Sequence, residues 1–200
     1  MAQIEGTAPA AIPAKEKALV ARIDRRFVDL LVSWTGAVLA VAMLALGGAA
    51  IFGGSFALDN VRDRLEPQNI SFAPADAMSP EEKAEVGAFA GQKVDTGQEA
   101  EAYSRYIGLH LAEVNEGATY SETSSQARAV DAEADPELAA ELSGKADTLF
   151  KGETLRAILL NAYGWWTVGQ ITMWVGIGAV IAGLFLAVFT GLGFFHARKV

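Results

Sequence analysis

Few side chains in this sequence could do chemistry, and their spacing does not build a recognisable site. The chain has two histidines, His110 and His196, and no cysteine. His110 and Glu113 are three residues apart on one face of a predicted helix, so together they could supply two metal ligands. A structural or catalytic metal needs more ligands than two. We therefore predict no metal site and expect His110 to be a partly buried structural histidine.

An acidic run offers a second candidate site, for calcium. Asp131, Glu133 and Asp135 alternate as calcium ligands do, but the central glycine and terminal glutamate of a calcium loop are missing. Pro136 instead fits the first position of a helix. The absence of cysteine excludes disulfides, thiolate metal sites and cysteine nucleophiles. We predict no catalytic residue and no cofactor, and the chain is not expected to be an enzyme.

Two long segments without Asp, Glu, Lys or Arg are the main feature of the chain. They cover residues 30–57 and 157–195, which is 28 and 39 residues. Each exceeds the roughly 20 apolar residues that cross a bilayer. A helix over 157–195 would be about 58 Å long against a hydrocarbon core of roughly 30 Å. We therefore predict transmembrane helices at 30–57 and 171–195, with 157–170 continuing the second span outward as a juxtamembrane helix.

Charge indicates how these spans are oriented. Residues 58–156 hold 20 of the 24 acidic and 9 of the 16 basic residues. Basic residues flank the other ends of the spans: Lys15, Lys17, Arg22, Arg25, Arg26, Arg198 and Lys199. Because Lys and Arg beside a span tend to stay inside, both termini should be cytoplasmic in a bacterial cell membrane, with the acidic domain extracytoplasmic. Such an acidic surface argues against a nucleic-acid partner. For the first span the alternative is a cleaved signal peptide, with Ser55-Phe56-Ala57 as the cleavage site.

The remaining segments have distinct expected roles. Residues 1–14 read as a flexible cytoplasmic tail and 196–200 as a basic cytoplasmic end. Residues 15–29 combine helical apolar spacing with basic residues, which fits either an amphipathic helix on the inner leaflet or a solvated extension of the span. Neither span has an ionisable residue in its middle, which disfavours ion conduction or pumping.

The acidic domain, 58–156, should be all-helical. Ser79 with Glu82 and Thr96 with Glu99 are capping boxes that start two helices, and Asp135-Pro136 starts another. Gly117 is the expected stop of the second helix. Asp59 to Ala77 should be an extended connector, and Tyr120 to Ala134 either a short helix or a loop. The expected fold is all-α, with two transmembrane helices flanking this domain.

Small residues recur every four positions in both spans and predict close helix packing. They are Ala45, Ala49 and Gly53 in the first span and Ala179, Gly183, Ala187 and Gly191 in the second. Whether they pack against the other span or against another protein is open. Aromatic residues should mark the membrane boundaries: Trp165, Trp166 and Trp174 on the outer side, and Trp34, Phe194 and Phe195 on the inner side.

Two segments, FAPADAMSPEEKAEV at 72–86 and TLFKGETLRAILLNAYGWW at 148–166, resemble a group of two-span membrane proteins from high-GC Gram-positive bacteria. Many members are labelled as the small subunit of an aromatic ring-opening dioxygenase. The resemblance covers most of the chain beyond the first span and implies the two-span architecture. Such dioxygenases work on a metal, and no functional residue of that kind is implied at any position here.

These features favour a non-catalytic accessory or scaffold subunit of a larger membrane assembly, such as a respiratory or transport complex. Its expected partners are membrane lipid and either other transmembrane subunits or a second copy of the chain. The alternative is an extracytoplasmic binding or sensing module anchored by the two spans. An outer pocket with converging polar groups would favour that alternative.

Overall fold

A computed structural model describes residues 14–198, with side chains from Arg25 onward. The expected tail over 1–13, the side chains of the basic lead up to Asp24, and residues 199–200 lie outside the described part. Within it the chain is all-helical, as predicted, and the one extended pairing is an isolated bridge between Ser71 and Lys93. The chain divides into two compact units, residues 1–49 with 175–200 and residues 50–174.

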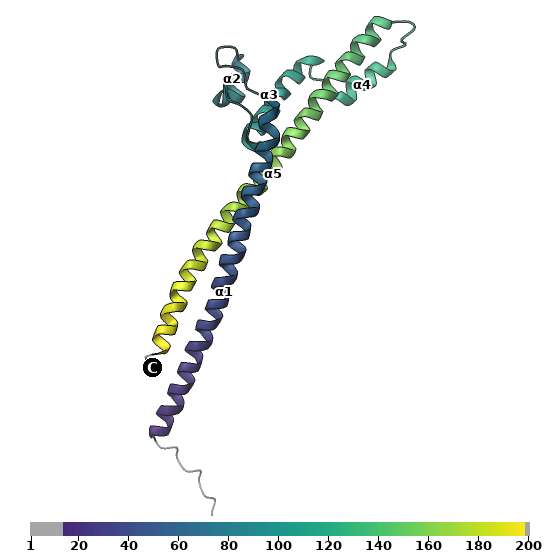
Figure 1. The fold of residues 1–200 in the computed structure, drawn as a ribbon. Helices are drawn as coiled ribbons and strands as arrows, with labels where there is room; N and C mark the ends of the chain where they lie inside the picture. The colour runs from purple at the N-terminus through teal and green to yellow at the C-terminus, as the bar shows by residue number, and fades with distance from the viewer. Residues whose placement is uncertain (1–13, 199–200) are drawn as a thin grey trace, which may run out of the picture. The chain divides into compact units, whose positions relative to one another are not determined.

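The helices α1 and α5 are far longer than the others (Figure 1). Helix α1 runs over Ala14–Leu65, 52 residues, and α5 over Pro136–Ala197, 62 residues. The expected extended connector is therefore wrong at its start, because Asp59 to Leu65 is helical. No proline or glycine follows Gly54 until Pro67, so the helix continues until the short 3-10 turn η1, Glu66–Gln68, and the left-handed Asn69 end it.

Both long helices are long and apolar enough to cross a membrane. Their most apolar windows are only 11% and 17% buried, whereas the core helix of a soluble protein would be mostly buried. Large apolar side chains of the first unit point outward, including Val41 at 67% exposure and Leu46 at 71%. The helices thus present an apolar surface outward on most of their circumference.

Local capping begins the shorter helices of the second unit. In α2, Pro80–Val86, Ser79 and Glu82 form the predicted capping box, with 2.6 Å from Ser79 N to Glu82 Oε2 and 3.1 Å from Glu82 N to Ser79 Oγ. The 3-10 turn η2, Gly87–Phe89, follows it directly. Helix α3, Gly97–Val114, begins at the predicted Thr96–Glu99 box. Both expected helix starts are therefore confirmed.

The segment after α3 forms a helix rather than a loop. Helix α4, Tyr120–Ala129, has a third capping box, between Thr119 and Glu122. A tight turn precedes it, in which Ala118 N donates to Asn115 O at 2.8 Å. Glu116 and Gly117 lie in this turn at φ values of 53° and 82°. Gly117 therefore marks the end of α3, as expected, because glycine takes this left-handed backbone without steric cost.

The core of the second unit gathers side chains from α1, α3, α5 and the segment around α2. Phe72 is 3% exposed, and its ring contacts those of Phe89, Tyr103 and Tyr106. The buried members of this cluster are Val61, Leu65, Phe72, Met78, Val86, Val94, Ala100, Ala102 and Leu159. Because Val61 and Leu65 end α1, the helical extension that the sequence did not predict contributes directly to the core.

Candidate functional site

In the first unit, α1 and α5 lie side by side (Figure 1) and touch through small residues spaced seven apart. The buried positions are Ser33, Ala40 and Gly47 on α1 and Gly176, Gly183, Thr190 and Ala197 on α5. A Cβ added at Gly47 would lie 2.9 Å from the Gly176 carbonyl oxygen, and one at Gly36 would lie 2.5 Å from Thr190 Oγ1. A seven-residue repeat of this kind fits left-handed antiparallel packing. Small side chains here let the two backbones approach closely.

The contact uses a different set of small residues from the predicted every-fourth stripes. Of those, Gly183 is buried against Met43 and Leu44, and Ala179 is half-buried. The others are exposed, namely Ala45, Ala49, Gly53, Ala187 and Gly191. A Cβ at Gly53 or Gly191 would meet nothing within 4 Å. These exposed positions do not join α1 to α5, and their role in contacting another helix stays a prediction.

In the second unit the same kind of contact recurs between α1 and α5. A Cβ at Gly54 would lie 2.7 Å from Met173 N and 2.8 Å from Gly169 O. One at Gly169 would lie 3.1 Å from both Ala57 Cβ and Leu58 Cδ2. Gly54 and Gly169 are each seven residues from the buried glycines Gly47 and Gly176 in the sequence. Backbone-to-backbone proximity is therefore a repeated feature of this helix pair.

Helix α3 packs antiparallel along α5, again through glycines. A Cβ at Gly97 would lie 2.2 Å from Trp166 Cβ, and one at Gly152 would lie 2.4 Å from Leu111 Cδ2. Between these points, Gly108 faces the guanidinium of Arg156. Leu159, at 4% exposure, is the apolar centre of this contact. Trp166 is thus half-buried against α3, and its place at a membrane boundary stays a prediction.

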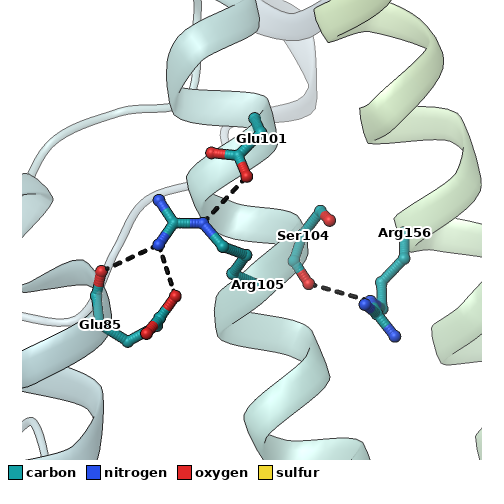
Figure 2. A network of polar contacts seen from close by, with 5 residues as sticks. All are labelled: Glu85, Glu101, Ser104, Arg105 and Arg156. Carbon is teal, nitrogen blue, oxygen red and sulfur yellow. Dashed lines mark hydrogen bonds and ion pairs between the residues drawn. The ribbon is translucent and has the colours of Figure 1, made fainter.

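A polar network reinforces the α2–α3–α5 contacts (Figure 2). Arg105 of α3 donates to the Glu85 carboxylate, to the Glu85 carbonyl at 3.2 Å and to Glu101 at 3.0 Å. Arg156 of α5 donates through Nε to the Ser104 carbonyl at 3.1 Å. The bond to Glu85 is the main cause that raises the pKa of Arg105. These contacts link α3 to Glu85 of α2 and to α5, and one of them joins successive turns of α3.

His110 contacts the carboxylate of Glu82, and its side chain is 52% exposed, so the expectation that this histidine is partly buried is wrong. Its Nε2 is 2.7 Å from Glu82 Oε1, and its ring meets that of Tyr106 edge-on, with 4.6 Å between centroids. Among residues with described side chains, no group of three or more His, Asp or Glu is placed to hold a metal ion. The hydrogen bond from the Ser79 backbone, and then the contact with His110, lower the pKa of Glu82. Nothing in the sequence around Glu82 signals this pairing, because 28 residues separate the partners.

The other predicted boundary aromatics lie on the outer surfaces of the helices. Trp34 is 64% exposed and packs edge-to-face on Phe194, with 5.6 Å between centroids. Phe195, Trp165 and Trp174 are also exposed. That they mark the membrane boundaries stays a prediction.

One open depression of about 360 Å³ lies between α3, the α3–α4 turn and α5. Leu111 and Leu149 line it, and Glu153 is its only charged lining residue. That carboxylate is already paired with Arg156 at 2.7 Å. The other polar side chains in the lining of this depression are those of Thr119, Tyr120 and Ser121.

Comparison with protein-family models, with curated proteins and with solved structures found no match to this chain.

Proposed function

We propose that this chain is a two-span membrane protein that serves as a non-catalytic accessory or scaffold subunit of a larger membrane assembly. In this proposal both termini are cytoplasmic and residues 58–156 are extracytoplasmic. The observation that carries it is the pair of long helices whose small-residue faces pack together and whose large apolar side chains point outward. Such an outward surface is stable in hydrocarbon and unfavourable in water.

The contact at Gly169 supports a position for the outer membrane boundary. Gly169 lies against Ala57 and Leu58 of α1, and the next residues of α1 include Asp59, Arg62, Asp63 and Arg64. Burying these charged residues of α1 in hydrocarbon would be costly. The part of α5 that precedes Gly169 therefore belongs outside the hydrocarbon core. The charge-free stretch of α1 then crosses about 42 Å, close to the whole thickness of a bilayer with its headgroups.

A scaffold role fits the remaining contacts better than catalysis does. The described ion pairs join α2 to α3, join the end of α1 to Asp95, or link successive turns of α3 and α5. The one histidine of the acidic domain is engaged by Glu82. Exposed small residues at Ala45, Ala49 and Gly53 leave a second face of α1 on which another transmembrane helix could pack closely. The alternative, a binding module, could use the open depression beside Glu153 or a second one of about 340 Å³ lined by Arg128 and Asp147.

Cysteine labelling in intact cells tests the sidedness, because the natural chain has no cysteine. Ser125→Cys should react with a membrane-impermeant maleimide in intact cells. Gln3→Cys should react only after the cells are permeabilised. The reverse pattern would overturn the proposed orientation.

Purification in mild detergent followed by mass spectrometry tests the assembly. Wild type should carry a stoichiometric transmembrane partner or self-associate, and Ala49→Leu should weaken that association by filling the exposed small face. Val38→Leu is the matched control, since Val38 is already large and is 65% exposed on the same helix. A monomeric wild-type chain without partners would contradict the scaffold proposal. Equal association of the two variants would contradict the proposed contact face.

A further inference from the structure

One carboxylate in the second unit has two structural tasks at once. Glu82 Oε2 accepts from the Ser79 backbone N–H at 2.6 Å and so caps α2. Its other oxygen, Oε1, lies 2.7 Å from His110 Nε2 on α3. The side chain of Glu82 is only 12% exposed, whereas that of His110 is 52% exposed. A change of charge at His110 therefore acts on a shielded carboxylate that holds the start of α2.

The surroundings of the imidazole are simple enough to assign its effect. From α2, the facing charged group is Glu82. On α3 itself, the Tyr106 ring packs against the imidazole, and Glu113 lies one turn further along. The second link between α2 and α3 is the ion pair of Arg105 with Glu85, and the hydrogen bond to Glu85 raises the pKa of Arg105. Of the groups in this contact, the imidazole is the type that ordinarily changes charge between pH 5 and 8.

We propose that the Glu82–His110 pair is a pH-sensitive contact that holds α2 more tightly against α3 at mildly acidic pH than at mildly alkaline pH. Histidine is the side chain whose charge normally changes between pH 5 and 8. In the neutral form Nε2–H can donate an ordinary hydrogen bond to Glu82. In the protonated form the same bond joins an imidazolium to a carboxylate, and such charge-assisted bonds are stronger. The contact lies wholly within the second unit and does not depend on the proposed membrane function.

Hydrogen exchange on the full chain in detergent micelles tests this contact. The amides of residues 80–90 would be followed by mass spectrometry at pH 5.5 and pH 8 and corrected for their intrinsic exchange rates. Protonation of His110 would convert its bond to Glu82 into a partly exposed ion pair. Local opening of residues 80–90 should then be about two- to fivefold rarer at pH 5.5 than at pH 8. The cap persists in this range because the pKa of Glu82 is lowered and its carboxylate stays ionised.

Three variants separate the contact from general stability. His110→Gln retains a neutral donor and should make opening equal at the two pH values. Glu82→Gln retains a helix-capping side chain but removes the charge, and should do the same. Arg105→Gln should increase opening by one common factor at both pH values. A wild-type ratio of one, or a ratio that survives in either His110→Gln or Glu82→Gln, would overturn the proposal.

Discussion

The neighbouring glycines Gly53 and Gly54 give a sharp test of the close contact between α1 and α5. Both lie inside α1, so replacing either with alanine should gain about the same helix propensity, roughly 1 kcal/mol. Their surroundings differ. A Cβ at Gly53 meets nothing within 4 Å, whereas one at Gly54 lies 2.7 Å from Met173 N, 2.8 Å from Gly169 O and 2.8 Å from Met173 Cβ. Two of these three atoms are backbone, so no side-chain rotation can relieve the overlap.

The size of the effect follows from that difference. Restoring an ordinary contact requires α1 and α5 to move apart by roughly half an ångström or more, and overpacking of this kind typically costs about 1–3 kcal/mol. Gly54→Ala should therefore be neutral or destabilising by up to about 2 kcal/mol, while Gly53→Ala should be stabilising by up to about 1 kcal/mol. Because the propensity gain is common to both, the two variants should differ by about 1–3 kcal/mol in the free energy of unfolding.

Unfolding of the full chain by SDS titration in mixed micelles, followed by tryptophan fluorescence, measures this difference. The comparison between adjacent positions removes most effects of the detergent on the unfolded state. If the two variants agree within about 0.5 kcal/mol, α1 and α5 do not touch at Gly54 and the packing described for this pair is wrong.

Three further predictions concern other contacts. A Cβ at Gly36 would lie 3.7 Å from Thr190 Cβ, within the disulfide range, so Gly36→Cys with Thr190→Cys should crosslink on mild oxidation. Val38→Cys, which faces outward, paired with the same Thr190→Cys should not, as a gel-shift assay with a thiol reagent would reveal. Gly97→Ala should destabilise the second unit by about 1–3 kcal/mol in thermal unfolding, because its Cβ would lie 2.2 Å from Trp166 Cβ. Hydrogen bonding lowers the pKa of Glu82, so the stabilisation that its carboxylate gives is present above the unfolded pKa near 4.5. This stabilisation is lost as pH falls through the lower folded pKa. Circular dichroism across pH 6 to 2 should therefore show a smaller loss of helix on acidification in Glu82→Gln.

The sequence by itself determined the helical class and most helix starts. Capping boxes are local, since the hydroxyl of Ser79 or Thr96 reaches an amide three residues away. The long apolar stretches likewise predict helices from their local composition, without reference to the rest of the chain. The Thr119–Glu122 box carried the same signal and could have decided between helix and loop for Tyr120 to Ala134. The continuation of α1 to Leu65 could also have been found, from the absence of proline and glycine before Pro67.

Tertiary structure alone decided which faces of the helices meet. Spans rich in alanine and glycine carry small residues at intervals of both four and seven. Periodicity alone does not show which of these two sets makes the helix contact. The partner helix selects the seven-residue set with Gly47 and Gly183, because α1 and α5 approach closely at these glycines and a 3.5-residue repeat keeps one face turned to the partner. The pairing of Glu82 with His110 is equally non-local, because it exists only once α2 has folded back on α3.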